Sequence, residues 1–326
     1  MGDFHQNGVI TTLHNITRRP VTDVERELES FQEVRPLGLL LPSLYSELKR
    51  PALETIVSEL QKVTYLSEVV IGLDCASEPE YRHAVEFFSR LPQRHRILWN
   101  DGPRLRELDA ELEALGLAPK EAGKGRNVWY CIGYILASGR AESVALHDCD
   151  IKTYTRELLA RLLYPVANPN FNYRFSKGYY TRTADGVMNG RVSRLLVTPL
   201  LRALKCVLGP NNYLDYLDTF RYPLAGEFSF RRDVLEDLRI PSDWGLEIGI
   251  LSEMYRNYST NRICQVDIAD TYDHKHQDLS VESPEKGLSK MSSDIAKALF
   301  RKLATQGTVL PNEAIRSIKA TYYRVA

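Results

Sequence analysis

The stretch SVALHDCD, residues 143–150, passes directly from a short apolar run to two carboxylates. A continuous apolar run of this kind is typical of a strand that is buried on both faces of a parallel sheet. In open α/β sheets, ligands bind outside the carboxyl ends of the strands. Residues 143–146 are therefore predicted to form a buried strand, with Asp148 and Asp150 at its ligand-binding end.

The same pattern recurs on the N-terminal side of this stretch. Residues 37–41 and 69–73 are apolar runs, residues 96–99 form a shorter one, and helical patterns are expected over 47–63, 80–91, 103–115 and 126–138. Alternating strands and helices predict an α/β fold with a doubly wound, mostly parallel sheet. Polar residues follow the first two strands at 42–47 and 74–77, so these strand ends and 148–150 are expected to form one pocket.

The rest of the chain is less regular. Helices are expected over 189–206 and 246–257, and a strand over 263–268 leads to His274-Lys275-His276. The sequence divides into a polar surface arm at 1–35, two halves at 36–150 and 151–280, and a helical C-terminal extension at 281–326. No internal repeat is visible.

Composition excludes several classes of function. The chain has 42 Lys and Arg and 42 Asp and Glu, so its zero net charge argues against non-specific nucleic-acid binding. Five scattered cysteines without a CxxC pair argue against a disulfide framework or a zinc site and favour a reducing, cytoplasmic location. The longest apolar run, 37–41, is too short to span a membrane, and the N-terminus lacks the apolar core of a signal peptide.

Carboxylates and imidazoles in this sequence could hold a metal ion. Asp148 and Asp150 can reach a divalent cation and the diphosphate that it bridges, and their hard oxygen ligands suit Mg²⁺ or Mn²⁺. His274 and His276 could add imidazole ligands, and Lys275 could meet phosphate charge. An Asp-x-Asp pair also arises by chance, and the histidines could belong to a polar loop without a role.

Two glycine-containing segments precede helices and could bind anions. Backbone amides at a helix start favour negative charge, which suits Gly123-Lys124-Gly125-Arg126 and Asn189-Gly190-Arg191-Val192-Ser193. A plain turn and an exposed helix cap are the alternatives. Glu227 and Glu247 each lie close to a glycine and could hold sugar hydroxyls, or could be ordinary surface residues. The sequence contains no Gly-x-Ser-x-Gly elbow.

Together, these pieces resemble the glucosyl-3-phosphoglycerate synthases and the related mannosyl-3-phosphoglycerate synthases, which are retaining glycosyltransferases of the GT-A fold. The resemblance runs from about Leu37 to about Leu279 and depends on the order and spacing of its motifs. In chain order these motifs are Leu41-Pro42-Ser43-Leu44, Leu73-Asp74-Cys75-Ala76-Ser77, Gly123-Lys124-Gly125, Asp148-Cys149-Asp150, Gly190-Arg191-Val192-Ser193, Pro223-Leu224-Ala225-Gly226-Glu227, Gly245-Leu246-Glu247-Ile248-Gly249 and His274-Lys275-His276.

The resemblance implies a nucleotide-sugar-binding half at 36–150 and an acceptor-binding half at 151–280. The residues that it implies for the donor are Pro42, Leu44, Glu47, Asp74, Ser77, Lys124, Asp148, Leu224, Glu227 and Glu247. Those implied for a Mg²⁺ or Mn²⁺ ion are Asp148, Asp150 and His274, and those implied for the acceptor are Gly190, Arg191, Val192, Ser193 and His276. Asp150, Glu247 and Lys124 are expected to carry the catalysis.

The implied reaction is transfer of glucose from UDP-glucose or GDP-glucose to the 2-hydroxyl of 3-phosphoglycerate. Tyr45-Ser46 replace the family's usual Asn-Glu, with Glu47 one step later, which leaves the base open. His276 replaces a usual Asn, which leaves the acceptor open. The alternatives are transfer from GDP-mannose, a sugar nucleotidyltransferase that releases pyrophosphate, and a sensor without turnover. No nucleic-acid or membrane partner is expected, and the helical C-terminus is compatible with a homodimer.

Overall fold

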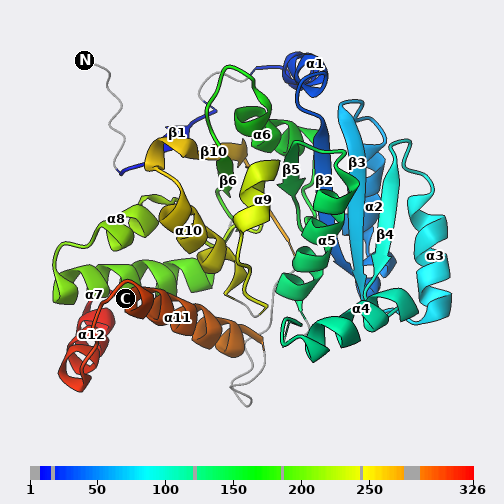
Figure 1. Ribbon diagram of the computed structural model, residues 1–326. Coiled ribbons are helices and arrows are strands. Elements are labelled where there is room, and N and C mark those ends of the chain that lie inside the picture. The colour runs from blue at the N-terminus through cyan, green and yellow to red at the C-terminus, as the bar shows by residue number, and fades with distance from the viewer. Residues whose placement is uncertain (1–7, 16–18, 120–122, 185–186, 243–244, 275–286) are drawn as a thin grey trace.

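The computed structural model describes residues 8–15, 19–119, 123–184, 187–242, 245–274 and 287–326. One eight-stranded sheet runs through the molecule in the order β1-β10-β6-β9-β5-β2-β3-β4, and β7 and β8 form a separate hairpin (Figure 1). The strands are β1 (Thr11–Leu13), β2 (Leu37–Leu44), β3 (Leu66–Asp74), β4 (His95–Trp99), β5 (Ser143–Leu146), β6 (Phe175–Tyr180), β7 (Thr183–Ala184), β8 (Val187–Met188), β9 (Phe228–Arg231) and β10 (Ile263–Ala269).

The sheet is parallel except at β9. This strand is antiparallel to both of its neighbours, β5 and β6, whereas all the other neighbouring pairs in the sheet are parallel. The predicted mostly parallel sheet is confirmed. Pro42, where the first apolar run was expected to stop, lies inside β2, but β5 pairs only as far as Leu40. The proline therefore has a partner only on the β3 side, where β2 locally resembles an edge strand, a position in which proline is tolerated.

Helices connect the strands and extend the chain at its C-terminus. The α-helices are α1 (Val21–Gln32), α2 (Pro51–Leu60), α3 (Glu78–Phe88), α4 (Pro103–Ala114), α5 (Lys124–Ser138), α6 (Arg156–Ala167), α7 (Thr198–Leu208), α8 (Asn212–Thr219), α9 (Arg232–Asp237), α10 (Leu246–Asn257), α11 (Gly287–Thr305) and α12 (Asn312–Val325). Three short helices of other types are η1 (Tyr45–Lys49), η2 (Ser193–Val197) and η3 (Thr260–Arg262), of which η2 is a π-helix.

Each face of the sheet carries its own hydrophobic core. Along β2, Leu39 and Leu41 point into the core that α1, α2, α3 and α6 complete, and Leu40 points into the core that α5, α7, α8, α10 and α11 complete. Successive strand residues point to opposite faces, so an unbroken apolar run requires helices on both sides. The doubly wound arrangement is confirmed, and α11 and α12 pack beside α7 and α10 (Figure 1).

The N-terminal segment differs from the expected surface arm. In its described part, β1 pairs in parallel with β10 as the edge strand of the sheet, and α1 packs on α6. Ile10 and Leu28 are buried. A three-residue strand is too short to show a periodicity, which is why the sequence did not reveal it. The C-terminal extension is helical as expected, and its described part forms two helices, α11 and α12.

No helix in the described part of the chain is both long enough and apolar enough to cross a membrane.

Candidate functional site

A cavity of about 430 Å³ opens at the carboxyl ends of β2, β3 and β5. All three strand-end clusters expected from the sequence contribute to its wall. From these strand ends, the lining includes Pro42, Leu44, Glu47, Asp74, Asp148 and Asp150. The prediction that these polar segments share one pocket is therefore confirmed.

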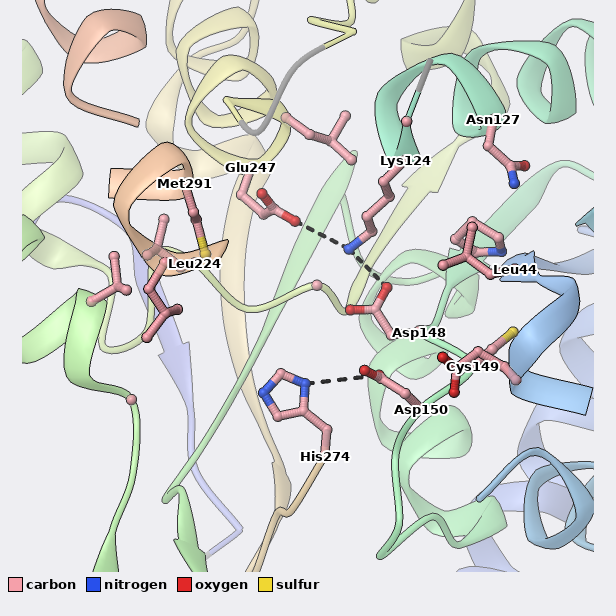
Figure 2. A pocket seen from close by; sticks show the side chains of 18 of the residues that line it. Leu44, Lys124, Asn127, Asp148, Cys149, Asp150, Leu224, Glu247, His274 and Met291 are labelled. Carbon is pink, nitrogen blue, oxygen red and sulfur yellow. Dashed lines mark hydrogen bonds and ion pairs between the residues drawn. The ribbon is translucent and has the colours of Figure 1, made fainter. Parts of the chain in front are cut away.

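Lys124 joins two sides of the cavity. It is the first residue of α5, and its Nζ lies 2.7 Å from Asp148 Oδ1, after β5, and 3.1 Å from Glu247 Oε1, in the first turn of α10 (Figure 2). Burial alone would lower the pKa of Lys124, but the charges of Asp148 and Glu247 outweigh burial and raise it above its usual range. The side chain is therefore a fixed cation held between two carboxylates.

Gly226 allows this ion pair to lie close to the backbone. A Cβ atom at this position would be 2.3 Å from Asp148 Oδ2 and 2.9 Å from Lys124 Nζ. Neither distance is compatible with a side chain unless the pair moves. The glycine of this motif therefore leaves the space that the Lys124–Asp148 ion pair occupies.

Asp150 and His274 point toward each other at the cavity wall (Figure 2). His274 Nδ1 lies 3.8 Å from Asp150 Oδ1, beyond hydrogen-bonding distance, and an isolated antiparallel bridge joins His274 to Ile151. A carboxylate oxygen and an imidazole nitrogen are suitable ligands for Mg²⁺ or Mn²⁺.

The third expected metal ligand, Asp148, is instead engaged by Lys124. Within the described ranges, no group of three or more His, Cys, Asp or Glu side chains is placed to hold a metal ion. A metal ion at Asp150 and His274 would therefore take further ligands from water or from a bound diphosphate, as Mg²⁺ commonly does.

The expected acceptor motif lies at another part of the same cavity. Gly190, Arg191 and Val192 line it, and Arg191 is the first residue of the helix that continues through η2 into α7. Gly190 has a φ of +81°, which favours glycine. Ser193 is buried and does not line the cavity. His276 lies outside the described residues.

Two residues predicted to contact the donor do not line the cavity. Ser77 caps α3, and its Oγ donates to Glu80 Oε2 at 2.8 Å. Glu227 is fully buried behind the cavity wall and accepts hydrogen bonds from Tyr180 and Tyr272. Burial and the charge of Asp148 raise the pKa of the Glu227 carboxyl, although the two hydrogen bonds oppose this effect.

Several cavity residues were not expected from the sequence. Asn127, Tyr180, Arg182, Tyr222, Lys290 and Met291 line the wall together with the predicted residues. Lys290 and Met291 belong to α11, outside the motifs that carried the resemblance, and Figure 2 shows Met291 near Leu224. Asn127 lies one turn after Lys124 in α5. The other five reach the site through packing between segments that are distant in the sequence.

Comparison with solved structures defines the class of fold. No protein-family model matches the chain. Glucosyl-3-phosphoglycerate synthase from Mycobacterium tuberculosis, solved with Mn²⁺, UDP-glucose and phosphoglyceric acid, superposes with a TM-score of 0.65 at 21% identity, over 90% of this chain and 88% of that one. The same enzyme with Mg²⁺ and UDP gives a TM-score of 0.63 at 21% identity, over 90% and 86% of the two chains. The predicted glycosyltransferase fold of GT-A type is confirmed.

Sequence relatives identify the family within that class. Glucosyl-3-phosphoglycerate synthase from Persephonella marina is 50% identical over 100% of this chain and 80% of the relative. The protein of the same name from Methanococcoides burtonii is 42% identical over 94% of this chain and 74% of the relative. The chain belongs to the glucosyl-3-phosphoglycerate synthase family.

Proposed function

We propose that this protein transfers glucose from a nucleotide-glucose donor to the 2-hydroxyl of 3-phosphoglycerate. The names of the two relatives described above support glucose over mannose. The single observation that carries the proposal is the position of Lys124 between Asp148 and Glu247, opposite Asp150 and His274. This arrangement suits a donor whose leaving group is a diphosphate and whose transferred group is a sugar.

The donor half of the site would stabilise the leaving group. Lys124 remains a cation because its two carboxylate partners raise its pKa, so it can meet the charge that develops on a diphosphate. A Mg²⁺ or Mn²⁺ ion bound at Asp150 and His274, with Asp148 nearby, would act there as a Lewis acid. Glu247 lies at the start of α10 with one oxygen on Lys124, and its other oxygen would accept a hydrogen bond from a sugar hydroxyl.

The ion pairs of the cavity carboxylates argue against a covalent intermediate. A covalent route requires a carboxylate that is available as a nucleophile. Each carboxylate that lines the cavity has a basic side chain within 4 Å: Arg50 for Glu47, Arg126 for Asp74, Lys124 for Asp148 and Glu247, and His274 for Asp150. We therefore favour front-face attack by the acceptor hydroxyl, with the departing phosphate oxygen as the base.

The acceptor half would lie at Gly190, Arg191 and Val192. A helix begins at Arg191. Backbone amides at a helix start favour an anion, and the guanidinium adds a positive charge, which together suit a phosphate. We extend the proposal to the division of the chain into a donor half at 36–150 and an acceptor half at 151–280. A cytoplasmic location and a homodimer are proposed with it.

A panel of nucleotide sugars against phosphorylated acceptors tests the proposal. The donors are UDP-glucose, GDP-glucose and GDP-mannose. UDP-glucose is tried first, because the solved Mycobacterium tuberculosis protein is described with it. Released nucleoside diphosphate is scored, and NMR of the product gives the anomeric configuration. We expect nucleoside diphosphate release that depends on 3-phosphoglycerate, and an α-glycoside from an α-linked donor.

The other outcomes separate the alternatives. Pyrophosphate release would indicate a sugar nucleotidyltransferase. Donor binding without turnover for any acceptor would indicate a sensor. Preference for GDP-mannose would change the sugar but keep the chemistry, and a β-glycoside would contradict front-face attack.

A further inference from the structure

Arg182 is a basic cavity residue without a role in the proposed reaction. It follows β6 and lines the cavity, where its Nη1 donates to the Tyr222 hydroxyl at 2.9 Å. Its Nε is buried and has no hydrogen-bond partner among the described residues. The guanidinium is thus held on one side by a phenol, and the hydrogen on its Nε is unused within the described residues.

The groups around Arg182 differ from those around Lys124. Lys124 lies between two carboxylates, whereas no carboxylate in the described part of the chain forms an ion pair with Arg182. Burial alone would lower the pKa of Arg182, but the hydroxyls of Tyr222, Tyr180 and Tyr272 outweigh burial and raise it. A guanidinium that lines the cavity and has no carboxylate partner among the described residues is suited to receive an anion.

Arg182 is also adjacent to the motif proposed for the acceptor. The Asn189 amide donates to the Arg182 carbonyl at 2.7 Å. A Cβ atom on Gly190 would lie 3.8 Å from Arg182 Cδ and 3.4 Å from Tyr222 Cε2. The backbone at Gly190 therefore passes close to the Arg182 side chain, and Arg191 follows it directly.

We infer that Arg182 binds the carboxylate of the acceptor, while Arg191 and the helix start bind its phosphate. A planar guanidinium matches a carboxylate through two parallel hydrogen bonds, and free helix amides match a phosphate. The 2-hydroxyl is on the carbon next to the carboxylate, so holding the carboxylate also orients the attacking oxygen. The protein therefore selects phosphorylated 2-hydroxy acids over phosphorylated polyols, an inference that rests on the proposed function.

The test compares two acceptors that differ in the carboxylate. Initial rates are measured with 3-phosphoglycerate and with glycerol 3-phosphate for the wild-type protein and Arg182→Met. We expect kcat/KM for 3-phosphoglycerate to fall roughly ten- to hundredfold, as loss of charge-assisted hydrogen bonds implies, with glycerol 3-phosphate near its wild-type value. Calorimetric titration of both acceptors in the presence of UDP gives the same comparison without turnover.

Three further variants control the test. Arg202→Met removes the same charge from an exposed position on α7 and should leave both acceptors unaffected. Tyr222→Phe keeps the charge of Arg182 but removes its hydrogen bond, so a smaller loss confined to 3-phosphoglycerate is expected. Arg182→Lys, which keeps a positive charge at this position, gives an intermediate loss and replaces the methionine variant if that one does not fold.

Equal losses on both acceptors, or no loss on 3-phosphoglycerate, would overturn the assignment of Arg182 and leave the proposed function standing. Failure of the wild-type protein to transfer glucose to either acceptor would overturn the proposed function, and the inference with it.

Discussion

Tyr180 and Tyr272 stack with their ring centroids 3.6 Å apart, and both hydroxyls donate to the same carboxylate. Tyr180 Oη lies 2.7 Å from Glu227 Oε2, and Tyr272 Oη lies 2.6 Å from Glu227 Oε1. Tyr180 ends β6, Glu227 directly follows Gly226, and Tyr272 precedes His274 by two residues. One buried carboxylate thus ties together three segments that contribute to the cavity wall.

The first prediction is that Glu227→Ala destabilises the protein strongly. Two buried phenol hydroxyls lose their acceptor, so a loss of about 2–5 kcal/mol in the free energy of unfolding is expected. Glu227→Gln keeps an amide oxygen as an acceptor and should lose less. Urea denaturation of both variants measures this, and a loss below about 0.5 kcal/mol in Glu227→Ala would contradict the tying role.

The second prediction concerns Lys177, which is buried in β6 and donates to the Ala225 carbonyl. Burial lowers the pKa of Lys177 to about 8, from 10.5 in the unfolded chain. Between these two pH values the unfolded chain binds more protons than the folded one, so the contribution of Lys177 to stability rises with pH. The full effect is about 3 kcal/mol, since each pKa unit corresponds to about 1.4 kcal/mol.

Lys177→Met removes this contribution while the other titrating groups remain in both proteins. Urea denaturation at pH 7, 8, 9 and 10 should show the wild-type protein gaining stability relative to the variant as the pH rises. A constant difference across this range would show that the amine titrates alike in the folded and unfolded chains.

The third prediction is dependence on a divalent metal ion. EDTA should abolish turnover, and Mg²⁺ or Mn²⁺ should restore it. Asp150→Ala should lose several kcal/mol of transition-state stabilisation, because the ion acts on the leaving group. Asp233→Ala, which removes an exposed carboxylate that does not line the cavity, is the matched control for initial rates. Full activity of Asp150→Ala in chelator would exclude this metal site.

The fourth prediction separates the acceptor end from the donor end. Arg191→Ala should weaken use of 3-phosphoglycerate by roughly one to two orders of magnitude, since charge-assisted hydrogen bonds are lost. Arg191→Lys should recover only part of the loss. Donor affinity, measured by calorimetry, should stay unchanged because Lys124 lies at the other end. Weaker donor binding with an unchanged KM for 3-phosphoglycerate would show that Arg191 binds the donor and not the acceptor.

The central sheet and much of its ligand-binding edge could be predicted from the sequence. The apolar runs that became β2, β3 and β5 are long enough to show burial on both faces, and the polar residues after them had to meet at one edge. The end of a strand can be recognised from neighbouring residues alone, which is why Asp74, Asp148 and Asp150 could be assigned to the cavity. The edge strand β1 could not be predicted, because three residues are too few to show a hydrophobic periodicity.

Ser77 and Glu227 were predicted to bind the donor but do not line the cavity, and the reasons differ. Ser77 is followed three residues later by Glu80, and this capping-box spacing before α3 was visible in the sequence. Glu227 could not be placed from the sequence, because its partners Tyr180 and Tyr272 lie far from it along the chain. Arg182 and Met291 were missed for the same reason, since only the folded chain brings them to the cavity.

The antiparallel strand β9 has a consequence for how the protein moves. It hydrogen-bonds to β5, whose end carries Asp148, and to β6, whose end leads to Arg182. A hinge between these two parts would have to break a ladder inside a continuous sheet, which is far costlier than rotating a loop. The distance between the two ends of the cavity is therefore set by the sheet, and any closure over the substrates has to come from side chains and surface segments moving above a rigid floor.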